Sequence, residues 1–192
     1  MKKSSNTVRI IAGTLRGRRI SFPNVDGLRP TGDRLRETLF SWLHDALPQS
    51  HCLDMFAGSG VLGIECISRG AAHVVLLEQS HGVCKVLNDN IERLGIDNVT
   101  VARINAMRGL QQYCAGRAVD IAFIDPPFEQ HLQRQAMTAL EESGVLARNA
   151  LVAVESGRHD DLPSPPAGWQ VEREKVAGNV RLRLYRVGTT QG

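Results

Sequence analysis

Apolar and polar segments alternate regularly along the chain after residue 49. Apolar runs short enough to be buried strands fall at 52–56, 73–78, 99–104, 119–124 and 150–155. Between them, apolar residues at helical spacing predict helices at 61–69, 80–94, 106–114 and 129–143. Strands that alternate with helices are typical of a parallel sheet covered by helices. The pattern therefore predicts an α/β fold.

Both ends of the chain depart from this alternation. Residues 8–11 and 18–22 predict a β-hairpin, and a helix with an apolar stripe should follow it and end at Pro48. Residues 170–176 and 181–187 flank Gly178-Asn179 and predict a second hairpin at the other end. We therefore expect a hairpin-and-helix extension over residues 1–48 and an α/β domain over residues 49–192.

A glycine-rich segment follows the first strand of the α/β domain. Gly58, Gly60 and Gly63 match the spacing G-x-G-x-x-G, and they lie between a predicted strand and a predicted helix. Glycines permit positive φ angles and let a ligand approach the backbone at the positive end of the helix. Glu78 ends the next strand, where it can accept hydrogen bonds from both hydroxyls of a ribose. This context favours a nucleoside-containing cofactor over a turn without a ligand.

Asp54, in the predicted first strand and beside the glycine turn, bears on the choice of cofactor. A carboxylate beside the turn would repel the pyrophosphate of NAD, whereas it would favour the ammonium and sulfonium of S-adenosylmethionine. Asn105 and Ala106 follow the third strand, where an adenine amine would be met. The residues therefore favour S-adenosylmethionine.

Asp125-Pro126-Pro127-Phe128 follows the fourth strand of the domain. Open α/β sheets bind their ligands at the carboxyl ends of the strands. An acid, two prolines and an aromatic ring make a rigid loop that can accept hydrogen bonds from an amine and stack on a flat base. Taken alone, the tetrapeptide also fits a strand end with Phe128 packed in the core.

These two motifs together resemble the amino-directed methyltransferases that use S-adenosylmethionine. More narrowly, the segments 9–13, 16–19 and 29–40 resemble the bacterial 16S rRNA guanine-N2 methyltransferases of the RsmD type, and the resemblance extends from about residue 8 to residue 187. It implies a Rossmann-like, seven-stranded class I methyltransferase sheet whose last strand is antiparallel. It also implies methyl transfer from S-adenosylmethionine, with S-adenosylhomocysteine as product, to the N2 amine of a guanine in 16S rRNA.

The resemblance assigns roles to individual residues. Asp125, Pro126 and Phe128 would be catalytic. The cofactor would be bound by Asp54, Phe56, Gly58, Ser59, Gly60, Glu78, Asn105 and Ala106. Asn105 stands where many methyltransferases have an aspartate, but its amide oxygen can still accept a hydrogen bond. The mechanism needs no metal ion.

Charge is unevenly distributed along the chain. Residues 1–36 hold nine of the 23 basic residues and two of the 20 acidic ones, so this segment carries a formal charge of +7 and the remainder −4. A basic segment rich in arginine suggests a polyanionic partner, although it could also be a solvated face. The candidates for contacts with RNA phosphates are Arg16, Arg18, Arg19, Arg29, Arg34 and Arg36. The segment Arg29-Pro30-Thr31 could instead border the cofactor pocket, and the sequence does not separate these two roles. By the resemblance, the partner is 16S rRNA in the small ribosomal subunit or an assembly intermediate of it.

Composition bears on whether the chain has disulfides, a metal site, a membrane span or a secretory signal. The four cysteines form no C-x-x-C pair and the six histidines no H-E-x-x-H motif, so we expect neither a disulfide framework nor a metal site. No apolar run approaches the roughly 20 residues that span a bilayer. Since the N-terminal lysines precede no apolar stretch, we expect no secretory signal. We expect a cytoplasmic monomer.

Three alternatives stay open on the residues alone. A methyltransferase that acts on adenine N6 of DNA or RNA would use the same tetrapeptide, and guanine is preferred only through the resemblance. An NAD-dependent oxidoreductase would share the glycine turn, and a non-catalytic RNA-binding protein could retain a vestigial cofactor site. The sequence does not identify the target nucleotide, nor whether naked RNA suffices.

Overall fold

The computed structural model describes residues 6–24, 32–114, 116–127, 131–160 and 164–188, which contain a seven-stranded sheet, a separate hairpin and five helices. The strands of the sheet are β3 (His51–Asp54), β4 (His73–Glu78), β5 (Val99–Arg103), β6 (Val119–Ile124), β7 (Leu146–Gly157), β8 (Trp169–Ala177) and β9 (Val180–Val187). Their order is β5-β4-β3-β6-β7-β9-β8. The first five are parallel, and β9 runs antiparallel to both β7 and β8. The predicted α/β class and the antiparallel last strand are confirmed.

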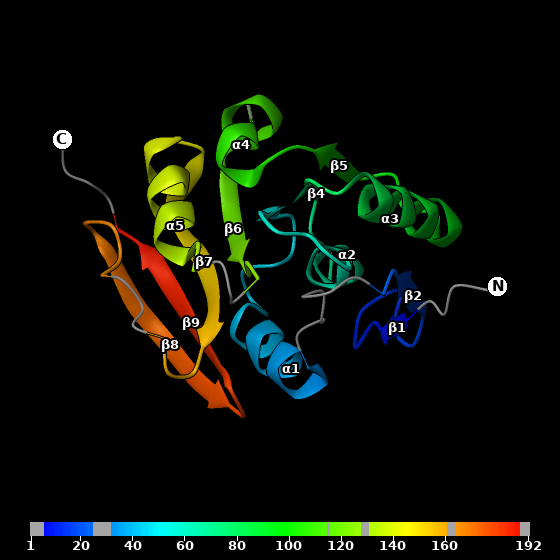
Figure 1. Ribbon diagram of the computed structural model, residues 1–192, viewed down its shortest axis with the longest axis horizontal. Helices are drawn as coiled ribbons and strands as arrows, with labels where there is room; N and C mark the ends of the chain where they lie inside the picture. Colours follow the sequence, from blue (N-terminus) through cyan, green and yellow to red (C-terminus); the bar gives the residue numbers. More distant parts are fainter. Residues whose placement is uncertain (1–5, 25–31, 115, 128–130, 161–163, 189–192) are drawn as a thin grey trace.

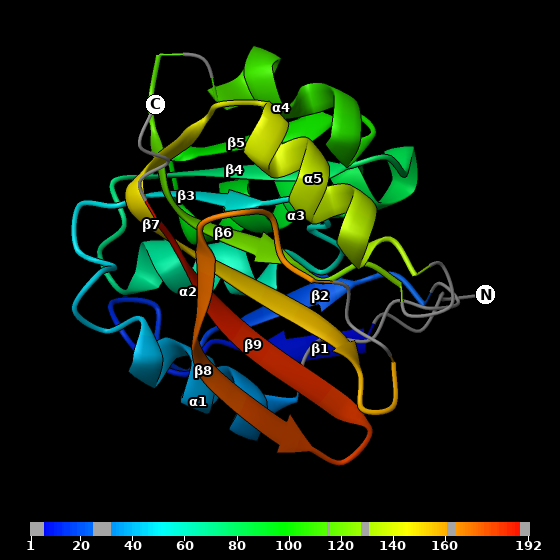
Figure 2. The same ribbon diagram turned by 90° about the vertical axis from the view of Figure 1, so that its left-hand side faces the viewer.

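Helices cover both faces of the sheet (Figures 1 and 2). They are α1 (Asp33–Trp42), α2 (Val61–Ser68), α3 (His81–Leu94), α4 (Ala106–Cys114) and α5 (Gln133–Glu142). Apolar residues of α1, α2 and α3 form one hydrophobic core, and those of α4 and α5 form a second core on the opposite face. Neighbouring strand residues alternate between the two cores, as Cys52 and Leu53 do.

The N-terminal hairpin consists of β1 (Asn6–Arg9) and β2 (Arg19–Phe22), paired antiparallel as predicted. Its buried side chains, such as Ile20 and Phe22, join the core that α1, α2 and α3 share. Asn90 of α3 bonds to the edge of the hairpin, because its Oδ1 accepts from the backbone N–H of Ser21 at 3.1 Å and its Nδ2 donates to the carbonyl of Ser21 at 2.7 Å. The hairpin is therefore fixed against α3.

Several element boundaries have local causes. Ser80 precedes α3 and accepts a hydrogen bond from Val83 N, whereas Gly95, with φ +69°, ends the helix in the left-handed conformation. Helix α5 begins later than predicted because His131 has φ +48°, which a right-handed helix excludes. Residues 129–130, where the predicted helix would begin, lie outside the described part. Among the residues described, no helix combines the length and apolar character needed to span a membrane.

Candidate active site

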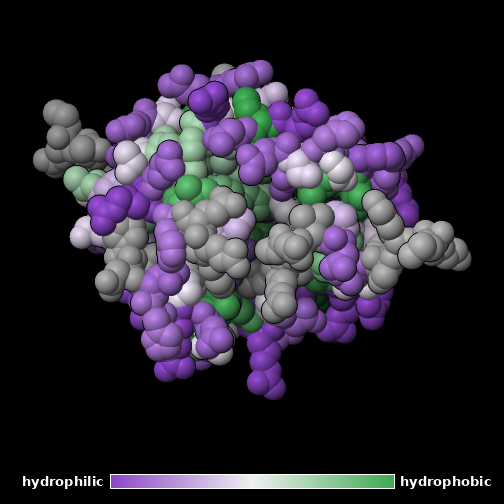
Figure 3. Space-filling view, viewed as in Figure 1, coloured by the Kyte–Doolittle hydropathy of each residue, from purple (hydrophilic) through white to green (hydrophobic). Residues whose placement is uncertain are grey.

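The carboxyl ends of the parallel strands meet at one edge of the sheet. Figure 2 shows the arrowheads of β3, β4, β5 and β6 pointing toward this edge, where β1 also begins, and Figure 1 views the molecule from it. On this face, hydrophobic residues show at several separate places among the hydrophilic residues that cover most of the surface (Figure 3). Asp54, Glu78 and Asp125 end or follow β3, β4 and β6, so the fold brings the predicted residues together.

The glycine turn connects β3 to α2. Gly58 and Gly60 have φ angles of +48° and +76°, which favour glycine, and Gly60 N donates to Ala57 O at 2.6 Å. Buried Ser59 accepts a hydrogen bond from Val61 N on its side-chain oxygen, at 3.4 Å. Gly63 acts differently, because a Cβ there would lie 2.4 Å from Leu76 Cδ2. The first two glycines shape the turn, and the third lets α2 pack closely on β4.

Glu78 lies at the end of β4 and faces this turn. Its Oε2 accepts a hydrogen bond from the backbone N–H of Gly58 at 3.1 Å, and its Oε1 accepts one from Ser80 N at 2.7 Å. Each carboxylate oxygen can accept a further hydrogen bond. The side chain is thus oriented by the backbone and keeps the capacity to bind two ribose hydroxyls.

Asp54 is buried, with 1% of its surface exposed, and its Oδ1 accepts from Phe56 N at 3.3 Å. Desolvation, with repulsion from Asp125 and Glu78, raises the pKa of Asp54 to about 7, although the hydrogen bond from Phe56 opposes this shift. A buried carboxylate among other acids is suited to a cation. The methionine ammonium of S-adenosylmethionine is a cation and therefore fits the chemistry of the Asp54 carboxylate.

Asn105 and Ala106 lie at the start of α4. Asn105 is exposed, and its Oδ1 accepts a hydrogen bond from Met107 N at 3.0 Å, while Ala106 is buried. The amide oxygen predicted to meet adenine thus also caps the helix. A second lone pair on this oxygen can accept from an adenine amine, so the assignment stays a prediction.

Asp125 follows β6 directly and is half-buried, close enough to Asp54 to raise its pKa. Pro126 is buried and Pro127 is exposed. Phe128, the predicted stacking residue, lies outside the described residues. Asp125 and Pro126 therefore lie at the same edge of the sheet as the predicted cofactor residues. Among the residues described, no group of three or more His, Cys, Asp or Glu could hold a metal ion.

The predicted RNA-binding arginines differ in their environments. Arg16, Arg18, Arg19 and Arg34 are exposed, and Arg29 lies outside the described residues. Arg36 has none of its side chain exposed; it donates to Asp33 Oδ1 at 2.7 Å and forms an ion pair with buried Glu65. The prediction that Arg36 contacts RNA phosphates is wrong, because its guanidinium is enclosed by the protein.

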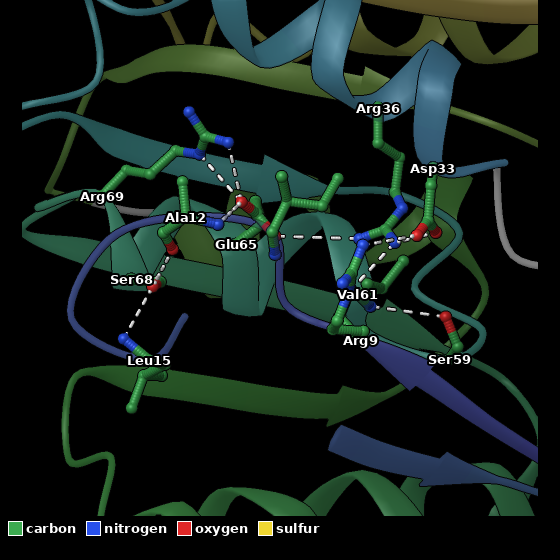
Figure 4. Close-up of polar contacts among 11 residues, drawn as sticks. Arg9, Ala12, Leu15, Asp33, Arg36, Ser59, Val61, Glu65, Ser68 and Arg69 are labelled. Atoms are coloured by element: carbon green, nitrogen blue, oxygen red, sulfur yellow. Dashed lines mark hydrogen bonds and ion pairs between the residues drawn. The ribbon is translucent and has the colours of Figure 1, made fainter. Parts of the chain in front are cut away.

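Sequence reasoning missed a buried polar cluster at the contact between the extension and α2 (Figure 4). Glu65 is fully buried in α2 and pairs with both Arg36 and Arg69. The spacing of Glu65 and Arg69, four residues apart on a helix, is a signal for a pair. The ion pair between Glu65 and Arg36 joins segments that are distant in the sequence, so no local sequence pattern indicates it.

Known proteins share this fold and are similar to this chain in sequence over nearly its full length. Ribosomal RNA small subunit methyltransferase D of Escherichia coli K12 is 46% identical over 182 residues, which cover 95% of this chain and 91% of that protein. The protein of the same name from Haemophilus influenzae is 43% identical, with 93% of each chain covered. A solved structure described as a putative methyltransferase yhhF from Escherichia coli superposes with a TM-score of 0.84 at 45% identity, and covers 95% of this chain and 99% of its own.

The family model described as "Conserved hypothetical protein 95" matches residues 8–186. This match includes most of the N-terminal extension, the glycine turn and Asp125-Pro126-Pro127-Phe128. Together with the relatives above, it confirms the resemblance inferred from the sequence. The chain therefore belongs to the Conserved hypothetical protein 95 family, to which the RsmD-type methyltransferases that it resembles also belong.

Proposed function

We propose that this protein transfers a methyl group from S-adenosylmethionine to the N2 amine of a guanine in the 16S rRNA of the small ribosomal subunit. The observation that carries the proposal is the placement of Asp125-Pro126 at the same sheet edge as Asp54 and Glu78. The names of its relatives, which specify methyltransferases of small-subunit ribosomal RNA, support the choice of substrate.

The cofactor is bound across the ends of β3, β4 and β5. Asp54 faces the ammonium, Glu78 accepts from the ribose hydroxyls, and Asn105 and Ala106 border the adenine. Phe56 and Ser59 complete the wall beside the Gly58–Gly60 turn. When bound, S-adenosylmethionine supplies an electrophilic methyl carbon on a sulfonium, so the reaction needs no metal.

Asp125 and the carbonyl of Pro126 accept the two hydrogens of the guanine N2 amine, and Phe128 stacks on the base. These hydrogen bonds orient the nitrogen lone pair, which is otherwise delocalised into the ring, toward the methyl carbon. With S-adenosylmethionine bound, the new N–C bond would form as the C–S bond broke, leaving S-adenosylhomocysteine. The proton of N2 passes to Asp125 or to water. Fixed geometry of this kind supplies a large part of the rate enhancement.

The exposed arginines Arg16, Arg18, Arg19 and Arg34, with Arg29, bind the RNA backbone. A base reached at the sheet edge has to be turned out of its RNA context, so contacts to flanking phosphates hold the RNA in place. We infer that the protein acts as a monomer in the cytoplasm on the subunit or on an assembly intermediate.

The test is methylation of 16S rRNA that lacks the modification, isolated from a strain deleted for the gene and supplied both as naked RNA and as small subunits. Nucleoside mass spectrometry should detect N2-methylguanosine after incubation with S-adenosylmethionine. Formation of N6-methyladenosine instead would establish the alternative acceptor. RNA binding without any methyl transfer, with no binding of labelled S-adenosylmethionine, would identify a binding protein.

A further inference from the structure

The segment that joins β1 to β2 is bound to the side of α2 through a buried carboxylate. Glu65 Oε2 accepts a hydrogen bond from Ile11 N at 2.8 Å, and Oε1 accepts one from Ala12 N at 3.0 Å. Arg69 donates its Nε to Oε1 at 2.9 Å, and Arg36 Nη1 lies 3.7 Å from Oε2. One carboxylate thus holds two backbone amides of the extension and is neutralised by two guanidinium groups (Figure 4).

Ser68, one turn further along α2, holds the next part of the same segment. Its carbonyl accepts from Thr14 N at 2.7 Å, and its hydroxyl accepts from Leu15 N at 2.9 Å and donates to Ala12 O. The backbones are so close that a Cβ at Gly13 would lie 1.7 Å from Ser68 O. The segment from Ile11 to Leu15 therefore has one fixed position on α2.

Arg36 extends this attachment to β1 and α1. Its Nη2 donates to Arg9 O at 3.0 Å and to Asp33 Oδ1 at 2.7 Å, and Asp33 in turn accepts from Arg9 Nη2 at 3.4 Å. Glu65 thus lies at the centre of contacts from three parts of the chain: the hairpin, α1 and α2.

Helix α2 also begins at the proposed cofactor turn, since Val61 follows Gly60 directly. Ser68 lies seven positions after Val61 on α2, and at 1.5 Å per helical residue the two are about 10.5 Å apart along the helix axis. The joining segment, which carries Arg16 and leads to Arg18, therefore lies toward the edge of the sheet opposite the carboxyl ends (Figure 2). Contacts to these arginines require an RNA that extends well beyond the target base.

We propose that Glu65 is a positioning residue for RNA: it fixes the arginine-bearing hairpin relative to the cofactor turn, so that an RNA bound along the hairpin presents its base at Asp125. This inference rests on the proposed function. Glu65 is buried and contacts neither RNA nor cofactor; it acts through Ile11, Ala12 and Arg36.

A carboxylate is needed at this position because all its partners are donors. Glu65→Gln would replace one acceptor oxygen by an NH₂ group, which would face an amide N–H or a guanidinium, and would leave two arginines without their common counter-charge. The matched control is Glu141→Gln on α5. Glu141 accepts a hydrogen bond from Trp169 Nε1 at 2.7 Å, and the buried apolar residues of α5 belong to the core on the opposite face of the sheet from the hairpin.

The experiment compares Glu65→Gln, Glu141→Gln and wild type for binding of S-adenosylmethionine, for kcat and KM on 16S rRNA that lacks the modification, and for the salt dependence of KM. We expect Glu65→Gln to bind the cofactor within about twofold of wild type, to raise the KM for RNA about tenfold, and to lower the slope of log KM against log salt by about 1, as the loss of one phosphate contact does. Amide exchange at Ile11 and Ala12 should become faster. Glu141→Gln should match wild type in all of these measurements.

Two results would overturn the proposal. One is faster exchange at Ile11 and Ala12 with KM and salt slope unchanged, because a displaced hairpin would then not matter to RNA. The other is an equal loss of cofactor affinity and RNA affinity, because Glu65 would then act on the whole fold. If Glu65→Gln does not fold, Ser68→Ala is tested instead. We expect the same pattern of changes with a smaller rise in the KM for RNA, about threefold, since Ser68→Ala removes a neutral contact to the same segment. A wild type that methylates no RNA refutes the proposed function and is recognised before any variant is compared.

Discussion

The carboxylate of Glu78 accepts a hydrogen bond from the backbone N–H of Gly58, at 3.1 Å. This contact joins the end of β4 to the turn that follows β3, across 20 residues of sequence. It fixes the direction of the carboxylate before any ligand is bound, and a second hydrogen bond from Ser80 N holds the other oxygen. An acceptor that is already oriented loses less entropy when ribose hydroxyls bind to it.

Glu78→Gln should weaken binding of S-adenosylmethionine by about 10- to 100-fold, since a hydrogen bond to a charged group contributes about 1.5–3 kcal/mol. The amide would place a donor against Gly58 N or Ser80 N and would also lose the charge that the ribose hydroxyls face. Isothermal titration calorimetry measures the effect. Gln79→Ala, at the exposed neighbouring position, is the control and should bind as wild type does. Unchanged affinity in Glu78→Gln would refute the ribose assignment.

Cofactor affinity should depend on pH through Asp54, whose pKa is raised to about 7. The ammonium favours the ionised carboxylate, so affinity should rise as pH increases from 5.5 to 7.5. Below pH 6 the change should approach tenfold per unit, because the ionised fraction falls by that factor. In the free protein the folded state holds this proton more tightly than the unfolded state, so Asp54's contribution to stability falls as pH rises from about 4 through 7.

The control for this pH dependence is methylthioadenosine, which retains the ribose and adenine but lacks the ammonium. Its affinity should stay constant between pH 5.5 and 7.5. Asp54→Asn should remove the pH dependence for S-adenosylmethionine as well, at reduced affinity. An equal pH dependence for both ligands would place the titrating group elsewhere than at the ammonium.

Gly63 should be needed for packing rather than for the ligand. Gly63→Ala would place a Cβ 2.4 Å from Leu76 Cδ2 and 2.9 Å from Val74 Cγ1, and overpacking of a core typically costs about 1–3 kcal/mol. Gly82→Ala in α3 is the matched control, since its Cβ would meet nothing within 4 Å; it should stabilise the protein by about 0.4–1 kcal/mol. Urea unfolding followed by circular dichroism measures both. Equal stability of the two variants would contradict this account.

The fold could be predicted because its signals are local and repeated. The runs at 73–78 and 119–124 coincide with β4 and β6, since buried strands bounded by turn residues stand out from the helices around them. Strand β7 is longer than its predicted apolar run because it continues into exposed residues such as Arg148, which pattern reading assigns to loops. Pairing between strands, not hydrophobicity, determines where it ends.

In the candidate site too, residues placed by local patterns could be predicted, and residues placed by contacts between distant segments could not. Asp54, Glu78 and Asp125 could be placed because they lie in, end and follow predicted parallel strands, respectively, and the topology then brings them to one edge. Arg36 could not be distinguished from Arg34, although one is buried and the other exposed. The difference arises from Glu65, which is 29 residues away and is brought near only by folding. Charge in a sequence therefore indicates a basic segment but not which members reach solvent.

Asp125→Asn should lower kcat for methyl transfer by about 100- to 1000-fold, the range found when one stabilising polar group is removed from an active site. The amide can present a donor where the N2 hydrogens need an acceptor, and it lacks the charge that draws out the nitrogen lone pair. Binding of S-adenosylmethionine should persist. Asp120→Asn, at the other end of β6, is the control: Asp120 accepts from His51 N at 2.8 Å, far from the carboxyl edge, so kcat should be retained. Comparable kcat values in the two variants would exclude Asp125 from the reaction.

Arg34 and Arg36 lie two residues apart on α1 and should give opposite results. Arg36→Met would leave the buried carboxylate of Glu65 without one of its two cationic partners, and the removal of one member of a buried pair costs about 3–5 kcal/mol. Arg34→Ala, at an exposed position, should change the free energy of unfolding by no more than about 0.5 kcal/mol. It should instead weaken RNA binding and lower the salt slope by about 1. Thermal unfolding and filter binding at several salt concentrations separate the two effects. Normal stability of Arg36→Met, or RNA binding by Arg34→Ala with an unchanged salt slope, would show that burial does not divide the arginines into structural and RNA-binding groups.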